Sequence, residues 1–156
     1  KREHLPLFLA ELHRGIARKR LRPYPQAQET LDQLRSQYHM AVVSDAQSAY
    51  AVPELHAMGL LHYFNPIIVS GDYGYRKPDP RLFQQALDAL RLRPEQALFL
   101  GNDLYHDIFG AQQVGMKAIF VSYNQGISSP QTISPDYTIY SFAELPQAIN
   151  YFLALG

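Results

Sequence analysis

The sequence has no cysteine, no net charge and no long hydrophobic run. Without cysteine the chain forms neither a disulfide nor a thiolate metal site, which is compatible with a reducing compartment, and we expect a cytoplasmic protein. The 14 basic and 14 acidic side chains balance, so there is no broad electrostatic surface for nucleic acid or an acidic membrane. No apolar run reaches the roughly 18 residues of a membrane span. We therefore expect neither a nucleic-acid partner nor a membrane partner.

What the sequence does contain is typical of one folded domain. Its 156 residues are 47% hydrophobic and 12% aromatic, which excludes a disordered chain and suffices for a sizeable core. Short apolar runs, expected as buried strands, alternate with segments whose apolar residues recur at helical spacing. The strands are expected at residues 40–43, 66–69, 98–100, 117–121 and 137–140, and the helices at 4–17, 26–38, 47 to about 58, 80–90 and 142–155. The alternation predicts an α/β fold with a parallel, doubly wound sheet.

The segment from Leu98 to Val121 organises the chain, because it reads as a strand, an acidic loop, a helix and a second strand. Asp103 and Asp107 lie in the acidic loop, at the sheet edge where open α/β folds bind ligands. Two carboxylates that converge there suit Mg²⁺, which binds through few carboxylates together with water and substrate phosphate. The alternative is that one of these aspartates only caps the helix.

Other polar residues follow neighbouring predicted strands. Ser44 and Asp45 follow the strand at 40–43, and Asp72 and Lys77 follow the strand at 66–69. A hydroxyl, an ammonium and a carboxylate pair together suit a phosphoryl group with Mg²⁺, since the hydroxyl donates to a phosphate oxygen and the lysine neutralises developing charge. Asp45 is a candidate for phosphate binding beside Ser44, although the pattern favours a capping role for Asp45 and Asp72.

Three motifs in this order resemble those of haloacid dehalogenase-like hydrolases. The segment Val42–Ala46 resembles the second motif of that family, an apolar strand that ends in Ser or Thr. The segment Gly74–Pro80 resembles the third motif, a lysine before a Pro-x-Pro helix start. The segment Gly101–Ala111, followed by Gly115, resembles the fourth motif, which binds metal. The resemblance covers residues 24–155.

The resemblance implies a Rossmann-like fold, Mg²⁺ and phosphoryl transfer through an aspartyl phosphate on a small phosphorylated metabolite. Carried across, Ser44 binds phosphate, Lys77 holds nucleophile and phosphate together, and Asp103 with Asp107 binds Mg²⁺. In the relatives closest in pattern, the glycine that corresponds to Gly101 is usually followed by an Asp that contacts the metal. Here Asn102 follows Gly101, so Asn102 and Asp103 are both candidates for this contact. Asp107 is expected in a surface loop, so that Asp107→Asn should remove charge while leaving the fold intact.

The family's first motif, Asp-x-Asp on an apolar strand, occurs nowhere in the sequence. Its first Asp is the nucleophile, and its strand precedes a helical cap. Residues 1–22 resemble the last part of such a cap, and residues 23–156 resemble the α/β core without its first strand. In this fold the absent strand lies between those that end at Ser44 and at Leu100. We therefore expect the chain not to fold alone, with the segment that carries the nucleophile supplied upstream or as a separate chain.

Two further functions stay open at this point. A catalytically inactive α/β module that binds a partner would also lack Asp-x-Asp. A haloacid dehalogenase would share the fold, although such enzymes lack the acid pair that resembles Asp103 and Asp107. The phosphatase is the favoured interpretation, and this chain alone is expected to be inactive.

Overall fold

The computed structural model describes residues 21–122 and 133–155. The predicted helix at 4–17, and with it most of the predicted cap segment at 1–22, lies outside these residues. The strands are β1 Val42–Ser44, β2 Ile67–Val69, β3 Leu98–Gly101, β4 Lys117–Val121 and β5 Tyr137–Ile139. The α-helices are α2 Ala27–Leu34, α3 Ser48–Ala57, α4 Ser70–Tyr73, α5 Pro80–Leu90, α6 Gly110–Gln113 and α7 Leu145–Leu153. A π-helix covers Leu104–Phe109, and short 3₁₀ helices cover Leu61–Tyr63, Pro94–Gln96 and Phe142–Glu144.

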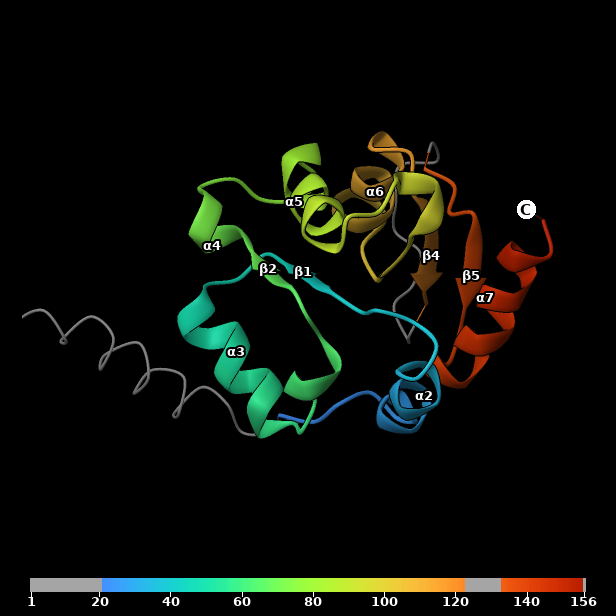
Figure 1. The fold of residues 1–156 in the computed structure, drawn as a ribbon, viewed down its shortest axis with the longest axis horizontal. Coiled ribbons are helices and arrows are strands. Elements are labelled where there is room, and N and C mark those ends of the chain that lie inside the picture. Colours follow the sequence, from blue (N-terminus) through green and yellow to red (C-terminus); the bar gives the residue numbers. More distant parts are fainter. Residues whose placement is uncertain (1–20, 123–132, 156) are drawn as a thin grey trace, which may run out of the picture.

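The strands form two parallel sheets (Figure 1). One contains β1 and β2, with Val43 opposite Ile68. The other has the order β3-β4-β5. Within the described parts of the chain, β1 and β3 are not paired with each other, and each has one edge without a partner strand. We call the break between these two edges the seam.

The free edge of β1 can be located from its hydrogen bonds. The amide of Val42 donates to the carbonyl of Pro66, on the β2 side. Backbone groups of successive residues in a strand point to opposite sides, so the carbonyl of Val43 faces away from β2. This carbonyl accepts a hydrogen bond from Nζ of Lys77 at 3.2 Å. The β1 edge at the seam is therefore partly satisfied by a side chain instead of a strand.

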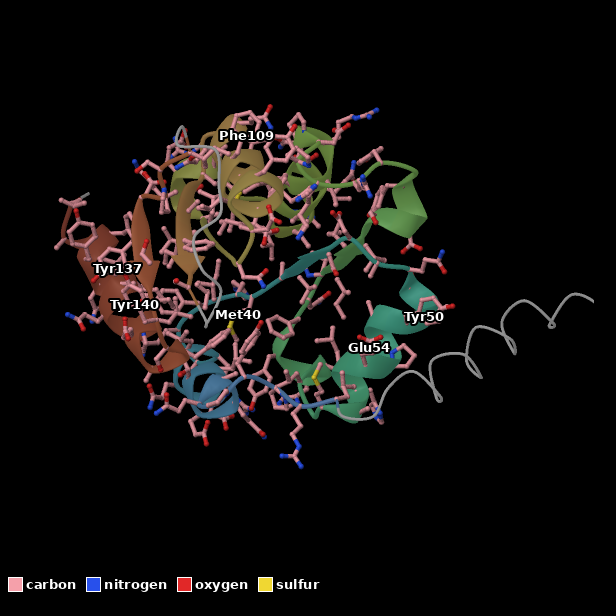
Figure 2. The ribbon with its side chains drawn as sticks, turned by 180° about the vertical axis from the view of Figure 1, so that it is seen from behind. Met40, Tyr50, Glu54, Phe109, Tyr137 and Tyr140 are labelled. Carbon is pink, nitrogen blue, oxygen red and sulfur yellow. The ribbon has the colours of Figure 1, made fainter. Side chains whose placement is uncertain are left out.

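Helices cover both faces of the three-stranded sheet, as a doubly wound fold requires. On one face the buried core consists of Phe83, Leu87, Ile108, Ala111, Met116, Ala118 and Phe120. On the other face α2 and α7 pack on β4 and β5, and the core consists of Leu34, Ile119, Val121, Ile139, Leu145 and Ala148. Met40, labelled in Figure 2, packs against this second cluster and also against the cluster of Leu31, Leu60 and Tyr63. The α/β class and the parallel strands predicted from the sequence are confirmed.

Helix α5 spans the seam. Its Leu82 and Ala86 are buried against Ile68 of β2, while its Phe83 and Leu87 belong to the core on β4. The helix begins where the sequence predicts, because the Asp79 carboxylate accepts a hydrogen bond from the amide of Arg81. Helix α5 thus packs on both sheets. No helix in the described segments has the length and hydropathy to cross a membrane.

Asp136 fastens the three-stranded sheet to α6. Its carboxylate accepts hydrogen bonds from the amide of Ala118 at 3.0 Å, from Gln112 at 3.1 Å and from Lys117 at 2.7 Å. Burial raises the pKa of Asp136, but the hydrogen bonds from these three residues outweigh it and leave the pKa below its usual value. Because the folded-state pKa is lowered, this stabilisation is present above the unfolded-state pKa and is lost as the pH falls through the folded-state value.

Asp136→Asn is accordingly expected to lower the free energy of unfolding at pH 7 by about 1–2 kcal/mol. The difference from wild type should shrink as the pH falls below about 4, the ordinary range of an aspartate. Urea unfolding of the complete protein across this pH range measures both effects. Asp88→Asn, at an exposed helix position that only bonds Gln84, is the matched control. A difference that persists unchanged at acid pH would contradict this assignment.

Candidate active site

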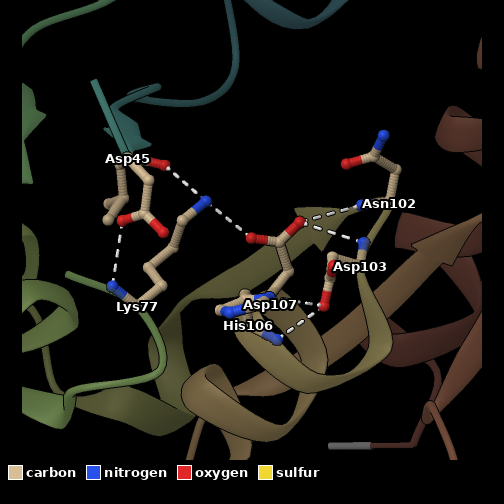
Figure 3. A network of polar contacts seen from close by, with 7 residues as sticks. Asp45, Lys77, Asn102, Asp103, His106 and Asp107 are labelled. Carbon is tan, nitrogen blue, oxygen red and sulfur yellow. Dashed lines mark hydrogen bonds and ion pairs between the residues drawn. The ribbon is translucent and has the colours of Figure 1, made fainter. Parts of the chain in front are cut away.

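A buried ion pair lies at the seam. Nζ of Lys77 is 2.6 Å from Oδ1 of Asp107, and the two side chains are 12% and 7% exposed (Figure 3). The same Nζ donates to the carbonyl of Val43. Lys77 follows β2 in the chain and Asp107 follows β3, so the pair joins the carboxyl ends of the two sheets. The sequence placed both residues at this edge, and the structure brings them together.

Asp107 is held in place on several sides. Its Oδ2 accepts hydrogen bonds from the amides of Asn102 at 3.0 Å and Asp103 at 3.1 Å. A side chain at Gly101 would collide with the Asp107 carboxylate, so only glycine allows this close approach. The expectation that Asp107 stands in a surface loop is wrong: it is 5% exposed, inside the π-helix. An isosteric Asn would therefore leave the Lys77 charge buried and unpaired.

Asp103 caps the start of the π-helix, as the alternative interpretation of this acid pair predicted. Its Oδ1 accepts a hydrogen bond from the amide of His106 at 2.7 Å, and Nδ1 of His106 lies 3.1 Å from the same oxygen. Burial raises the pKa of Asp103, but the hydrogen bonds from His106 outweigh it and lower the pKa below its usual value. Figure 3 shows the Asp103 carboxylate directed to His106 and the Asp107 carboxylate directed to Lys77. The Asp103 side chain is half exposed, which leaves it accessible to a ligand.

The remaining predicted residues differ in their contacts. Ser44 ends β1, and its hydroxyl makes no hydrogen bond to any described residue. Asp45 accepts a hydrogen bond from the backbone amide of Lys77 at 2.9 Å, so its carboxylate holds the lysine loop. Asp72 accepts a hydrogen bond from Ser48 at the start of α3. Asn102 is exposed, and its backbone amide donates a hydrogen bond to Asp107.

The residues on the β3 side offer a donor set that suits a hard cation. Asp103, Asp107 and the side-chain oxygen of Asn102 are all oxygen ligands, and Mg²⁺ needs only one or two carboxylates when water and phosphate complete its shell. In residues 21–122 and 133–155, no three His, Asp or Glu side chains gather closely enough to hold a metal by themselves. The described carboxylates are thus fit to be part of a magnesium site that further ligands complete.

Sequence reasoning missed three features of this site. These are the carbonyl of Val43 as a partner of Lys77, the contact that requires Gly101, and the π-helical turn that carries Asp107. The glycine was visible as part of a motif, but its close approach depends on tertiary packing. The π-helix has no local sequence signal, because it follows from the position that Asp107 takes between Lys77 and two amides.

Comparison with known proteins shows the family of this chain. Residues 1–121 match the family model of haloacid dehalogenase-like hydrolases. The chain is 32% identical over 131 residues to a glyceraldehyde 3-phosphate phosphatase of Pyrococcus furiosus, which covers 83% of this chain and 54% of that protein. It matches the crystal structure of a HAD phosphatase from Thermococcus onnurineus with a TM-score of 0.74 and 31% identity, over 81% of this chain and 57% of the other.

A 2-haloacid dehalogenase from Pseudomonas syringae is similar as well, with a TM-score of 0.70 and 28% identity, over 82% of this chain and 53% of that chain. The chain belongs to the haloacid dehalogenase-like hydrolase family. It spans about half the length of the curated relatives it matches.

Proposed function

We propose that the complete protein is a Mg²⁺-dependent phosphatase that acts on a small phosphorylated metabolite. The observation that carries this proposal is the buried Lys77–Asp107 pair, which contacts Val43, the residue before Ser44, and lies next to the half-exposed carboxylate of Asp103 in the chain turn that carries Asp107. An ammonium, a hydroxyl and carboxylates at one sheet edge suit a phosphoryl group and its metal. The phosphatase named above, at 32% identity, supports a small phosphorylated substrate.

In this proposal the Ser44 hydroxyl donates a hydrogen bond to a phosphate oxygen. The Lys77 ammonium neutralises charge on the phosphoryl group as it transfers to an aspartate, and Asp45 fixes the lysine by holding its backbone amide. Asp107 and Asp103, with Asn102 beside them, would hold Mg²⁺. When bound, that ion would stabilise negative charge on the phosphoryl oxygens.

We propose further that the nucleophilic aspartate stands on a strand that occupies the seam. Such a strand would pair with the free edges of β1 and β3, and its carboxyl end would come out beside Ser44, Lys77 and Asp107. No described residue occupies this position. The strand would come from a segment upstream of these residues or from a separate chain, and residues 1–22 would then belong to a helical cap.

Release of inorganic phosphate by the complete protein tests this function. We expect turnover of para-nitrophenyl phosphate with Mg²⁺, a loss of at least about 100-fold with EDTA, and recovery when Mg²⁺ is restored. Binding of phosphate without turnover would support an inactive binding module instead. Release of halide from a 2-haloacid without added metal would support a dehalogenase, whose fold this chain shares.

A further inference from the structure

A cavity lies where the loops that follow β1 and β2 meet, and it includes Asp45, which contacts the Lys77 loop. Its volume is about 510 Å³, within the range of small-molecule sites. Its lining consists of Asp45, Ala46, Gln47, Tyr50, Ser70, Gly71, Gly74, Tyr75 and Arg76. Tyr50, on the first turns of α3, is labelled in Figure 2. The cavity is open and is suited to part of a small polar molecule.

The walls of this cavity are fixed by contacts between the two loops. The amide of Gly71 donates to the carbonyl of Ala46 at 2.9 Å, and the hydroxyl of Ser70 donates to the same carbonyl at 3.2 Å. A Cβ at Gly71 would lie 3.0 Å from that carbonyl oxygen, which is tighter than ordinary packing allows. The loops are therefore held together at the base of the cavity.

The cavity and the proposed phosphate site share a contact through Asp45. Asp45 lines the cavity and also holds the backbone amide of Lys77, the next residue after Arg76. The candidate phosphate ligands Ser44 and Lys77 are thus each one residue away from a residue that lines the cavity. A phosphate ester bound at Ser44 and Lys77 could therefore extend its leaving group into this space.

Arg76 is the single cationic side chain that lines the cavity, and it is exposed. No ion pair joins it to any residue within the described ranges. Nearby Arg81, by contrast, pairs with Asp79 at 2.6 Å and lies over the ring of Tyr75 at 4.2 Å. A guanidinium without a partner at the edge of a cavity is suited to bind a carboxylate through two parallel hydrogen bonds.

We propose that this cavity is the subsite for the substrate's leaving group and that Arg76 recognises a carboxylate on it. The substrates would then be phosphate monoesters of small hydroxy or amino acids. The Gln47 side chain can donate or accept a hydrogen bond, and the Asp45 carboxylate can accept one, at a hydroxyl or amino group beside the substrate's carboxylate. This inference rests on the proposed phosphatase function and names its substrate class.

The test is calorimetric binding of two phosphonates to the complete protein with Mg²⁺. Phosphonoacetate carries a carboxylate beside its phosphonate, and methylphosphonate does not. We expect wild type to bind phosphonoacetate about 10- to 100-fold more tightly, as a charged hydrogen bond implies. Arg76→Gln should reduce that ratio to within about twofold, and Arg76→Lys should retain part of it, since lysine keeps the charge but not the planar fork.

The matched control is Arg91→Gln, at an exposed arginine at the end of α5, which should leave the ratio unchanged. Equal affinities for the two phosphonates in wild type, or a preference that survives Arg76→Gln, would overturn the subsite. Because binding is measured without turnover, the two proposals can fail separately. A protein that prefers phosphonoacetate through Arg76 but hydrolyses no ester would retain the subsite and lose the phosphatase assignment.

Discussion

The double variant Lys77→Met/Asp107→Asn of the complete protein is expected to keep most of its stability while losing turnover by about 10³-fold or more. Asp107→Asn alone is expected to lose both. The pair is buried, with side chains 12% and 7% exposed. Removing one partner of a buried ion pair costs about 3–5 kcal/mol because the charge of the other partner is left uncompensated. Removing both charges avoids that cost, but it also removes the ammonium and one proposed metal ligand.

Urea unfolding and phosphate release of wild type, both single variants and the double variant form a double-mutant cycle. The control cycle uses Asp32→Asn and Arg35→Met. These two exposed side chains form an ion pair at 3.7 Å, with Asp32 on α2 and Arg35 directly after it. Its coupling free energy should be at most about 1 kcal/mol, with turnover unchanged. If the double variant retained turnover, Lys77 and Asp107 would not be catalytic. If its stability matched that of Asp107→Asn alone, the pair would not be coupled.

Residues 1–156 produced alone are expected to lack a cooperative unfolding transition. The edges of β1 and β3 at the seam leave backbone groups without a partner strand, apart from the hydrogen bond of Lys77 to Val43. A backbone group that is shielded from water without a partner costs about 1–3 kcal/mol, while whole domains are stable by only about 5–15 kcal/mol. The residues of β1 and β3 were expected to be buried, but in the structure they are half-buried or, at Leu98, exposed, so only part of this cost applies to each. Helix α5 still packs on both sheets.

Near-ultraviolet circular dichroism and urea unfolding of this chain, with and without an added polypeptide, measure that expectation. The polypeptide should carry an apolar strand that ends in Asp-x-Asp, and a scrambled version of the same composition is the control. We expect the strand to restore a cooperative transition and the scrambled version to have no effect. A sharp transition of the chain alone, with a free energy typical of a complete domain, would show that the seam needs no strand.

Features set by neighbouring residues were predictable from the sequence. Asp79 and Pro80 start a helix wherever they stand before an apolar-periodic run, and the run at Ile67–Val69 reads as a buried strand whatever surrounds it. The contact of Lys77 with Asp107 followed from the rule that parallel strands end at one edge.

Features set by distant contacts were not predictable. The burial of Asp107 depends on the ammonium that reaches it from another loop, and the spacing of Asp103 and Asp107 does not contain that information. Asp45 looks like a turn residue in sequence, but its carboxylate positions a backbone amide 32 residues away. The roles of these acids in binding metal and phosphate stay predictions.

The π-helical turn at Leu104–Phe109 makes this site sensitive to chain length. The amide of Ile108 donates to the carbonyl of Asp103 at 3.1 Å, so this turn encloses one residue more than an α-helical turn does. Deletion of one residue between Asp103 and Asp107 would let the turn close as an α-helix and would rotate the second carboxylate by about 100° around the helix axis. We therefore expect this site to tolerate a substitution in the turn better than the deletion of one of its residues.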